Sequence, residues 1–476
     1  MNASFTQWHE NERLVAVAQT SLGRLVLWTA AILLLAWHES NLLMLVAFTL
    51  VMFYPARRRF LLSLAAFGII VDGLLRRMDL EFDVAFLVTG LADSSQWLLL
   101  MGQAAMVLGL LYLAFLVVLR FDQWPTIIKR YPVLSLHSGI WMALMLSTLP
   151  WLGVLVQVSF LAWRMSYLVK FASRGMAAGT KFHDHLFYLM PVFGGSSTPY
   201  GKGLDFLSRH EARDSVAFAR SQLAGIKLLL LAIMWLYLRD LMDAAIFGQT
   251  DKPLAAWFGS WTLNLPHLAE FLQAEINPPW YQGWGVIYLE LIRDTLKLAA
   301  FGHVIVGSLR LLGFNVFRNT YKPLLAESIV EFWNRYYFYF KELLVEFFFY
   351  PIYLRLRSTS PRLRLFAAIF AAAFLGNMYY HLLYQPEAVI NLDFAYLWAK
   401  WGTRLVYCFL LVFGIWVSML RQQKQRQANT TASFPIRLRR IAGVWTFYAI
   451  IQIWNVRSVE VSIIECLNFF VSLFGL

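Results

Sequence analysis

One histidine lies inside an apolar segment near the end of the chain, next to aromatic side chains. His381 follows Tyr379 and Tyr380, and it is the only histidine in the final third of the sequence. A neutral imidazole in an enclosed polar cavity can take the proton of a hydroxyl group near pH 7. The residues alone leave two interpretations open: a general base, or a packed member of an aromatic belt.

A second group of ionisable residues lies upstream, again among aromatic side chains. Glu331, Arg335, Glu342 and Glu346 recur at i, i+4, i+11 and i+15, and these spacings predict one stripe along a helix. Two interpretations stay open here as well. The stripe is either the salt-bridged face of a helix at a membrane interface or a charged wall that lines a cavity.

Other combinations of residues are weaker signals of chemistry. The His-Asp-His triplet at 183–185 could ligate a metal, but it lies in a polar loop and lacks fixed partners. The glycine-rich run at 194–203 lacks the spacing of a phosphate-binding loop and its final Ser or Thr. The two cysteines form no CxxC pair, and no nucleophile elbow is present in context. The sequence therefore predicts no metal site and no bound cofactor.

The elements that hold these residues are predicted to be apolar helices. The chain has 476 residues, of which 59% are hydrophobic and 14% are charged, against about 45–50% and about 25% in soluble domains. This composition excludes an ordinary soluble fold, a disordered chain and a coiled coil. A helix needs about 20 apolar residues to cross a bilayer core of about 30 Å. Runs of this kind predict an all-α polytopic membrane protein with roughly 11 transmembrane or re-entrant helices. The runs are Leu22–Trp37, Leu42–Tyr54, Phe60–Leu75, Trp97–Leu119, Val133–Val169, Leu223–Phe247, Val286–Leu312, Leu365–Leu383, Phe394–Leu420, Ile441–Trp454 and Val459–Leu476.

The distribution of charge predicts the orientation of the last helices. The net charge is +13, and the basic residues lie between apolar runs, which indicates contact with anionic lipid. Arg355–Arg364 and Arg421–Arg440 contain basic residues and no acid, so both are predicted to be cytoplasmic. Gln385–Asp393 contains two acids and no base, so it is predicted to lie outside. His381 comes 17 residues after Arg364, about 25 Å along a helix, and is therefore expected in the outer half of the membrane.

The polar parts of the chain are short. The first apolar run begins about twenty residues in and has no basic segment before it, so residues 1–21 are predicted to form an interfacial helix and no cleavable signal. The longest polar region is about Ala172–Gln222, with room for one amphipathic helix over Asp205–Gln222. The basic excess of Lys170–Arg213 predicts a cytoplasmic location.

A longer series of residues follows one order along the chain. Its members are Gly313-Phe314, Asn319, Pro323, Ser328, Phe332-Trp333-Asn334-Arg335-Tyr336-Tyr337, Glu346, Phe349-Tyr350-Pro351 and Tyr380-His381. This order resembles the signature of the membrane-bound O-acyltransferase family, and most of all its bacterial branch, which includes the alginate O-acetylation and teichoic-acid D-alanyl transfer proteins. Upstream, Val158–Phe160, Ser166–Leu168 and Met190–Gly195 resemble further family segments. The resemblance covers about Val158–Leu405.

The sequence departs from the family's pattern at several positions. Asn334 stands where the family has the first Arg of a pair, and Glu346 stands where it has an Asp. Leu382 replaces the Gly that follows the family's His. Some relatives carry a second His after a Trp-Gly on the next helix, whereas Trp401-Gly402-Thr403-Arg404-Leu405 has none.

The resemblance implies a fold, a division of the chain and a location. The fold is a set of roughly 11 membrane helices around a central tunnel. Its implied parts are an N-terminal interfacial helix over 1–21, N-terminal transmembrane helices over 22–157, a catalytic core over 158–405 and C-terminal transmembrane helices over 406–476. The implied location is the bacterial cytoplasmic (inner) membrane.

The resemblance also implies a reaction. An acyl group, acetyl among the candidates, moves from a thioester on CoA or an acyl carrier protein to a hydroxyl acceptor. The acceptor is a polysaccharide or another extracytoplasmic or secondary-metabolite molecule, and proteins of the same pathway are partners. His381 is the implied general base, and Lys322 and Arg335 bind the phosphates of the donor. Asn319, Trp333 and Tyr380 shape the tunnel, and Glu346 orients Arg335. No nucleic acid is involved.

Two other functions compete with this interpretation. A transporter or lipid flippase would use Glu331, Arg335 and Glu346 as an internal charge relay. A non-catalytic membrane scaffold would retain the acyltransferase fold without its activity.

Overall fold

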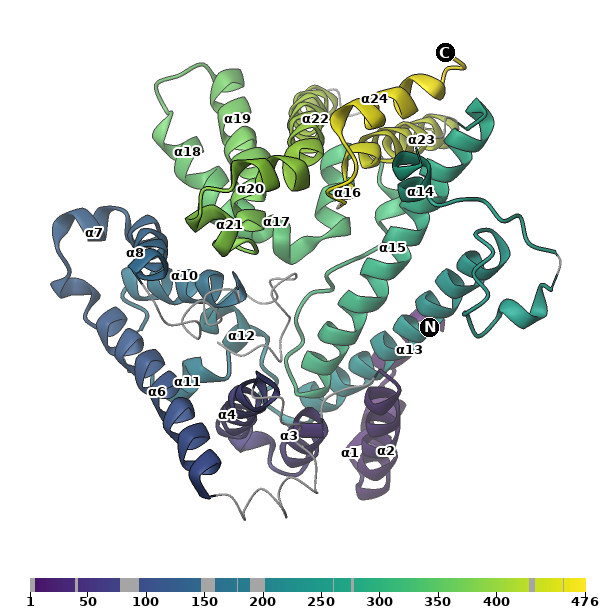
Figure 1. The fold of residues 1–476 in the computed structure, drawn as a ribbon. Helices are drawn as coiled ribbons and strands as arrows, with labels where there is room; N and C mark the ends of the chain where they lie inside the picture. The colour runs from purple at the N-terminus through teal and green to yellow at the C-terminus, as the bar shows by residue number, and fades with distance from the viewer. Residues whose placement is uncertain are drawn as a thin grey trace. The chain divides into compact units, whose positions relative to one another are not determined.

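A computed structural model describes residues 5–38, 42–77, 94–146, 159–177, 179–188, 202–259, 261–274, 278–427, 433–456 and 458–476 (Figure 1). In these ranges the backbone forms helices and turns, and its extended pairing is limited to an isolated antiparallel bridge between Glu211 and Phe314. Each apolar run of the sequence contains or overlaps a helix. The predicted all-α class is confirmed for the described part of the chain.

Four described helical stretches are long and apolar enough to cross a membrane. They are Met101–Leu119, Ser215–Ala245, Pro361–Leu382 and Phe394–Gln422. A fifth candidate joins Glu12–Gln19 and Ser21–Trp37 across a bend of 95°. Shorter apolar helices cover Leu42–Phe53, Pro132–Leu146 and Ile463–Ser472. Four or five candidate spans thus lie in the described ranges, while the larger count of roughly 11 elements stays a prediction.

Large apolar side chains are exposed on several of these helices. Leu22, Leu98 and Leu146 expose 72%, 74% and 77% of their surfaces. Extended apolar surface is unfavourable in water but is the normal outer face of a helix that contacts lipid. These helices are compatible with an integral membrane protein.

The chain divides into two compact units. Unit 1 comprises Met1–Leu229 with Ile305–Phe317, and unit 2 comprises Leu230–Val304 with Arg318–Leu476. Two long helices, α13 and α15, contribute one part to each unit. The predicted limits at residues 157 and 405 do not coincide with these boundaries, and the four-part division stays a prediction.

Unit 1 contains mostly short and medium-length helices. In the described residues they are η1 (Phe5–Glu10), α1 (Glu12–Gln19), α2 (Ser21–Trp37), α3 (Leu42–Phe53), η2 (Pro55–Arg57), α4 (Arg58–Arg77), α6 (Ser94–Leu119), η4 (Phe121–Gln123), α7 (Thr126–Arg130), α8 (Pro132–Leu146), α10 (Ser159–Ser173), α11 (Phe182–Leu186), α12 (Leu204–His210), the first part of α13 (Ser215–Ala245) and the last part of α15 (Trp280–Leu311).

The N-terminal segment forms the amphipathic helix α1. The side chain of Asn11 accepts hydrogen bonds from the backbone N–H groups of Arg13 and Leu14, which starts the helix. Val15 and Ala18 are buried, whereas the charged side chains of α1 are exposed. An amphipathic helix is therefore present within residues 1–21, and its place at a membrane surface stays a prediction.

The predicted amphipathic helix over Asp205–Gln222 is wrong as one element. It is divided into α12 and the start of α13, and the break covers residues 211–214. The backbone N–H of Ala212 donates to the carbonyl of Gly313 at 2.8 Å, so it is withdrawn from any helix. Asp214 then starts α13 by accepting a hydrogen bond from the Ala217 N–H at 2.7 Å.

Within unit 1, α13 and α15 (Trp280–Leu311) approach each other through glycines. A Cβ atom at Gly225 would lie 2.8 Å from the carbonyl oxygen of Gly307 and 2.9 Å from Cγ of Leu311. The hydroxyl of Ser221 donates to the carbonyl of Arg310 at 2.7 Å. Small residues that admit a neighbouring backbone are typical of contacts between membrane helices.

Gly225→Ala is expected to destabilise the protein by about 1–3 kcal/mol, because the added methyl group meets backbone atoms that cannot turn away. Thermal unfolding in detergent measures the effect. Gly109→Ala is the matched control, since a Cβ at Gly109 on α6 meets nothing within 4 Å. Equal melting temperatures for the two variants would contradict the close packing.

Unit 2 contains the remaining helices and two π-helical segments. In the described residues it contains the second part of α13, η6 (Ala255–Trp257), α14 (Leu268–Gln273), most of α15, η7 (Pro323–Leu325), α16 (Ile329–Tyr336), α17 (Phe338–Leu344), η8 (Val345–Phe349), α18 (Tyr350–Arg355), α19 (Pro361–Phe370), η9 (Ala371–Gly376), α20 (Asn377–Leu382), α21 (Pro386–Ile390), α22 (Phe394–Gln427), α23 (Phe434–Ile451), η10 (Gln452–Trp454) and α24 (Ile463–Ser472). A core of buried residues from α14, α15, α16, α19, α22, α23 and α24 holds them together.

Candidate functional site

The charged, aromatic segment after residue 324 forms two short helices, α16 and α17, where the sequence predicts a single helix. The Ser328 hydroxyl accepts a hydrogen bond from the Glu331 N–H at 3.1 Å and starts α16. The helix ends at Tyr337, whose φ of −141° and ψ of 74° are not helical. The N–H of Phe338 donates instead to the carbonyl of Asn319 at 3.0 Å, and α17 begins there. The predicted single stripe is therefore wrong.

The four ionisable residues of that stripe consequently have different surroundings. Glu331 and Arg335 share α16 and form an ion pair at 2.5 Å. Glu342 lies on α17 and pairs with Lys341. Glu346 lies on the π-helix η8. The carboxylate paired with Arg335 is thus Glu331, and the orienting role of Glu346 stays a prediction.

The two predicted donor-binding residues lie near each other, with Lys322 in the turn before η7 and Arg335 in the last turn of α16. An Arg335 guanidinium nitrogen approaches the carbonyl oxygens of Lys322 and Leu325, at 3.4 Å each. Lys322 has a φ of 50°, a left-handed turn that brings the chain back toward α16. Lys322 is exposed and Arg335 is partly exposed, so an anion can reach both side chains.

Two π-helical segments are in contact in unit 2. They are η8, which carries Glu346, and η9, which leads directly into α20 and His381. At Gly376 a Cβ atom would lie 2.7 Å from a ring carbon of Phe348, so the two segments are in close contact there. π-helical segments are frequent at functional sites. This contact brings the two predicted motif segments together.

The predicted tunnel residues form one continuous series of contacts. The Trp333 ring meets the Phe340 ring edge-on at 6.4 Å between centroids, and Phe340 meets Tyr380 at 4.8 Å. Asn319 is buried and accepts a hydrogen bond from the N–H of Tyr339 at 3.3 Å. Asn319, Trp333 and Tyr380 are therefore all connected through α17.

His381 lies half-buried at the end of α20 and faces α22. Its ring stacks on the indole of Trp401, with 5.0 Å between centroids and 26° between planes. A guanidinium nitrogen of Arg404 lies 3.1 Å from Nε2 of His381 and 3.4 Å from Nδ1. The other terminal nitrogen of Arg404 donates to Oδ1 of Asn455 at 2.9 Å. The imidazole is thus held between an aromatic face and a cation.

The Arg404 guanidinium determines how the His381 imidazole can hydrogen-bond with it. Arg404 is only 3% exposed, and its guanidinium stays charged in proteins. A guanidinium only donates hydrogen bonds, so it pairs with whichever of the two imidazole nitrogens carries no proton, and that depends on the tautomer. A neutral imidazole can accept a proton, and an adjacent buried guanidinium can stabilise a developing oxyanion. The pair combines both properties.

Sequence reasoning did not select Arg404 or Asn455. A signal for Arg404 existed, because an arginine inside the apolar run Phe394–Leu420 is a functional-site hypothesis in itself. Asn455 follows the run Ile441–Trp454 and carries no local signal. Only the packing of η10 beside α22 brings it to the guanidinium.

A buried ionic network in unit 2 is a further feature that sequence reasoning missed. Asp243 is fully buried, and its carboxylate contacts Arg293 at 2.6 Å and Arg239 at 3.5 Å. Arg293 also reaches Glu290 at 3.4 Å, and Glu290 accepts a hydrogen bond from Nδ1 of His267 at 2.6 Å. Each buried carboxylate in this network has a basic partner, as low dielectric surroundings require.

The weaker sequence signals do not form a site in the described residues. Burial would raise the pKa of the Asp184 carboxyl, but hydrogen bonds from the backbone of Lys181 and from Arg59 outweigh it and lower that pKa. The Asp184 carboxylate forms a salt bridge with Arg59 at 3.3 Å. No cluster of metal ligands is found among the residues that the structure describes. Met190–Gly195 and most of the glycine-rich run at 194–203 lie outside the described ranges.

Comparison with known proteins adds no relative. No protein-family profile matches the chain, and no curated protein matches it.

Proposed function

We propose that the protein is a membrane-embedded O-acyltransferase, which moves an acyl group from a thioester to a hydroxyl group. The observation that carries the proposal is the contact between His381 and the buried Arg404 at 3.1 Å. The resemblance of the sequence to the acyltransferase family supplies the reaction class. The contact supplies two groups that this reaction needs, a proton acceptor and a cation for the oxyanion.

The reaction follows from these two groups. The unprotonated nitrogen of His381 takes the proton of the acceptor hydroxyl as the hydroxyl oxygen attacks the thioester carbonyl carbon. The carbonyl oxygen gains negative charge, and N–H groups of Arg404 turn to donate to it. The carbon–sulfur bond then breaks, and the thiolate leaves with the proton from the imidazolium. The products are an ester and a thiol, so no other reactant is needed.

The substrates are proposed from the residues predicted to bind the donor and to line the tunnel. Lys322 and Arg335 are reachable cations that suit the phosphates of CoA or of an acyl carrier protein. Asn319, Trp333 and Tyr380 would line the path of the acyl group through a tunnel in the helical core. A polysaccharide or another extracytoplasmic hydroxyl compound would be the acceptor, in the inner membrane of a bacterium, alongside proteins of the same pathway.

Purified protein incubated with a panel of acyl-CoAs and acyl carriers tests the proposal, with products and free thiol followed by mass spectrometry. His381→Gln is expected to lower product formation by at least about 10²-fold, because general base catalysis contributes about 10²–10⁴-fold. Thermal unfolding should stay close to that of the wild type. His210→Gln is the matched control, since His210 is also half-buried but hydrogen-bonds a carbonyl of its own helix, that of Phe206. Equal activity of both variants would overturn the proposal, and thiol release without an acceptor would indicate hydrolysis.

The second candidate function is a transporter or flippase, and the buried ionic network around Asp243 favours it. Such networks inside apolar helices often mark ion or substrate pathways. The charge relay suggested by the sequence is less suitable, because Glu331 and Arg335 are partly exposed. A transporter would retain substrate flux in His381→Ala and lose it in Glu290→Gln. A scaffold would retain pathway output in both variants.

A further inference from the structure

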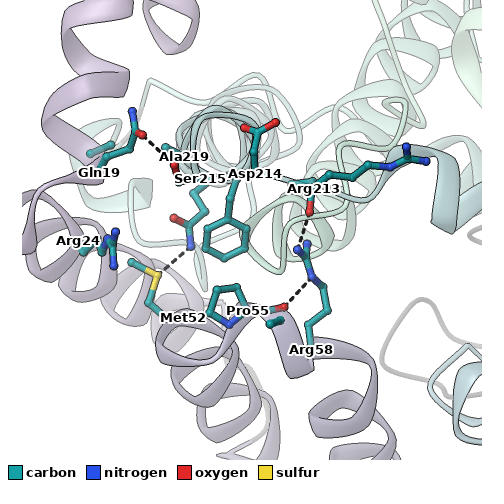
Figure 2. A pocket seen from close by; sticks show the side chains of 14 residues that line it. Gln19, Arg24, Met52, Pro55, Arg58, Arg213, Asp214, Ser215 and Ala219 are labelled. Carbon is teal, nitrogen blue, oxygen red and sulfur yellow. Dashed lines mark hydrogen bonds between the residues drawn. The ribbon is translucent and has the colours of Figure 1, made fainter.

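Unit 1 contains a cavity of about 250 Å³ between α1, η2 and the start of α13 (Figure 2). Its buried lining includes the apolar side chains of Met52 and Ala219 and the amide of Gln222. Its exposed lining includes Arg24 and Arg213. The cavity is therefore apolar and amide-lined inside and basic at its mouth.

The buried arginine of the cavity has a structural role. Arg58 donates to the carbonyl oxygen of Pro55 at 3.0 Å (Figure 2), and to those of Ala212 and Gly313 at 2.6 and 3.2 Å. It also pairs with Glu211 at 3.2 Å. Its hydrogen bonds and its charge are thus used within the protein, and it fixes the segments that form the wall.

The two exposed arginines differ from Arg58, because neither forms an ion pair with a described residue. Arg24 comes from α2 and Arg213 from the segment before α13, so cations from two segments belong to the lining; Figure 2 shows the Arg213 side chain extending away from Arg24. One carboxylate, that of Asp214, also lines the mouth, and it already accepts the Ala217 N–H at 2.7 Å. Two guanidinium groups against one carboxylate leave a net positive mouth that suits an anion.

Gln222 supplies a polar group inside the cavity. It is 2% exposed, and its amide nitrogen donates to Sδ of Met52 at 2.8 Å and to the carbonyl of Leu311 at 3.4 Å. Its Oε1 accepts no hydrogen bond from a described residue. Since buried acceptors normally have a donor, this oxygen suits a hydroxyl group of a ligand.

We propose that this cavity binds the headgroup of an anionic phospholipid that carries a hydroxyl group, as in phosphatidylglycerol. The phosphate contacts Arg24, Arg213 adds to the positive potential of the lining, and the headgroup hydroxyl donates to Gln222. The volume is below the about 300–1,000 Å³ of complete small-molecule sites, so it fits a headgroup whose acyl chains remain in the bilayer. The amphipathic α1 and the basic segment Lys170–Arg213, which the sequence predicts to be cytoplasmic, favour the leaflet that is rich in anionic lipid.

The purified full-length protein in detergent tests this proposal, by native mass spectrometry with short-chain phosphatidylglycerol, phosphatidylmethanol and phosphatidylcholine. Phosphatidylglycerol is expected to bind most tightly, and more weakly as salt increases. The double variant Arg24→Gln/Arg213→Gln is expected to weaken its binding by at least about tenfold. Arg24→Lys/Arg213→Lys should retain most of the binding, because it keeps both charges.

Arg220→Gln is the matched control, since Arg220 is an exposed cation on α13 that does not line the cavity. Gln222→Leu should remove the preference for phosphatidylglycerol over phosphatidylmethanol and leave the phosphate contribution intact. An equal loss of binding in Arg220→Gln, or equal binding of phosphatidylcholine, would overturn the proposal. Inorganic phosphate is the last probe, and displacement of the lipid by it at comparable concentration would identify a soluble phosphate site instead.

Discussion

Replacement of Arg404 by glutamine is expected to lower kcat for acyl transfer by about 10²–10³-fold, the usual effect of removing one donor to an oxyanion. The physical reason is that glutamine offers a neutral amide where the transition state places negative charge. The KM for the thioester should change little, because the charge develops only during the reaction. Initial rates of thiol release at varied donor concentration measure both quantities.

Two further variants give this prediction its controls. Arg404→Lys keeps the positive charge but loses the second terminal nitrogen, which donates to Asn455, so it should recover part of the rate. Lys400→Gln, one turn earlier on α22, removes a cation that donates to the Tyr396 hydroxyl at 2.9 Å, and it should be close to wild type. A raised KM with unchanged kcat in Arg404→Gln would show that Arg404 binds the donor and has no part in the chemical step.

The segment that departs from the family's pattern is the one that contacts His381. Some members of the acyltransferase family that the sequence resembles have a second histidine after a Trp-Gly pair, whereas this chain has Arg404 two residues after Gly402. Arg404 contacts a ring nitrogen of His381, and Trp401 stacks on the face of the same ring. In the proposed reaction, Arg404 is a permanent cation that donates to the oxyanion, a different solution from a second imidazole.

The positions of the helices could be predicted from the sequence because their signal is local. The apolar residues of a run such as Phe394–Leu420 indicate by themselves that the run contacts lipid or the protein core. The helix α22 (Phe394–Gln427) covers this run. The helix breaks could not be predicted in this way. The breaks at 211–214 and at Tyr337 depend on carbonyl groups of Gly313 and Asn319, which lie elsewhere in the chain.

The candidate site was predictable to the same limited extent. His381 is visible in the sequence, because an ionisable residue within an apolar run is costly and therefore informative. Its partners come from α22 and from Asn455, residues whose proximity depends on how three segments pack. Lys322 and Arg335 lie close together because a short turn brings near neighbours in the sequence into contact, and their donor-binding role stays a prediction.

Asp243→Ala is expected to have the largest effect on stability, a loss of about 3–5 kcal/mol in the free energy of unfolding. The change leaves Arg293 and Arg239 without the buried carboxylate that each contacts, and an uncompensated charge in a low dielectric is unfavourable. Chemical unfolding in detergent, followed by tryptophan fluorescence, measures the difference. Asp205→Ala is the matched control, since it removes an i,i+4 ion pair at 3.2 Å with Arg209, whose side chain is 70% exposed, and it should cost less than about 1 kcal/mol.

The double variant Asp243→Leu/Arg293→Met separates this explanation from a simple packing defect. Because both charges are removed together, it should recover much of the lost stability. An equally unstable double variant would mean that the volume of Asp243 matters more than its charge. Recovery of stability without recovery of substrate flux would instead show that the charges of the network are needed for transport. The transporter alternative requires this outcome.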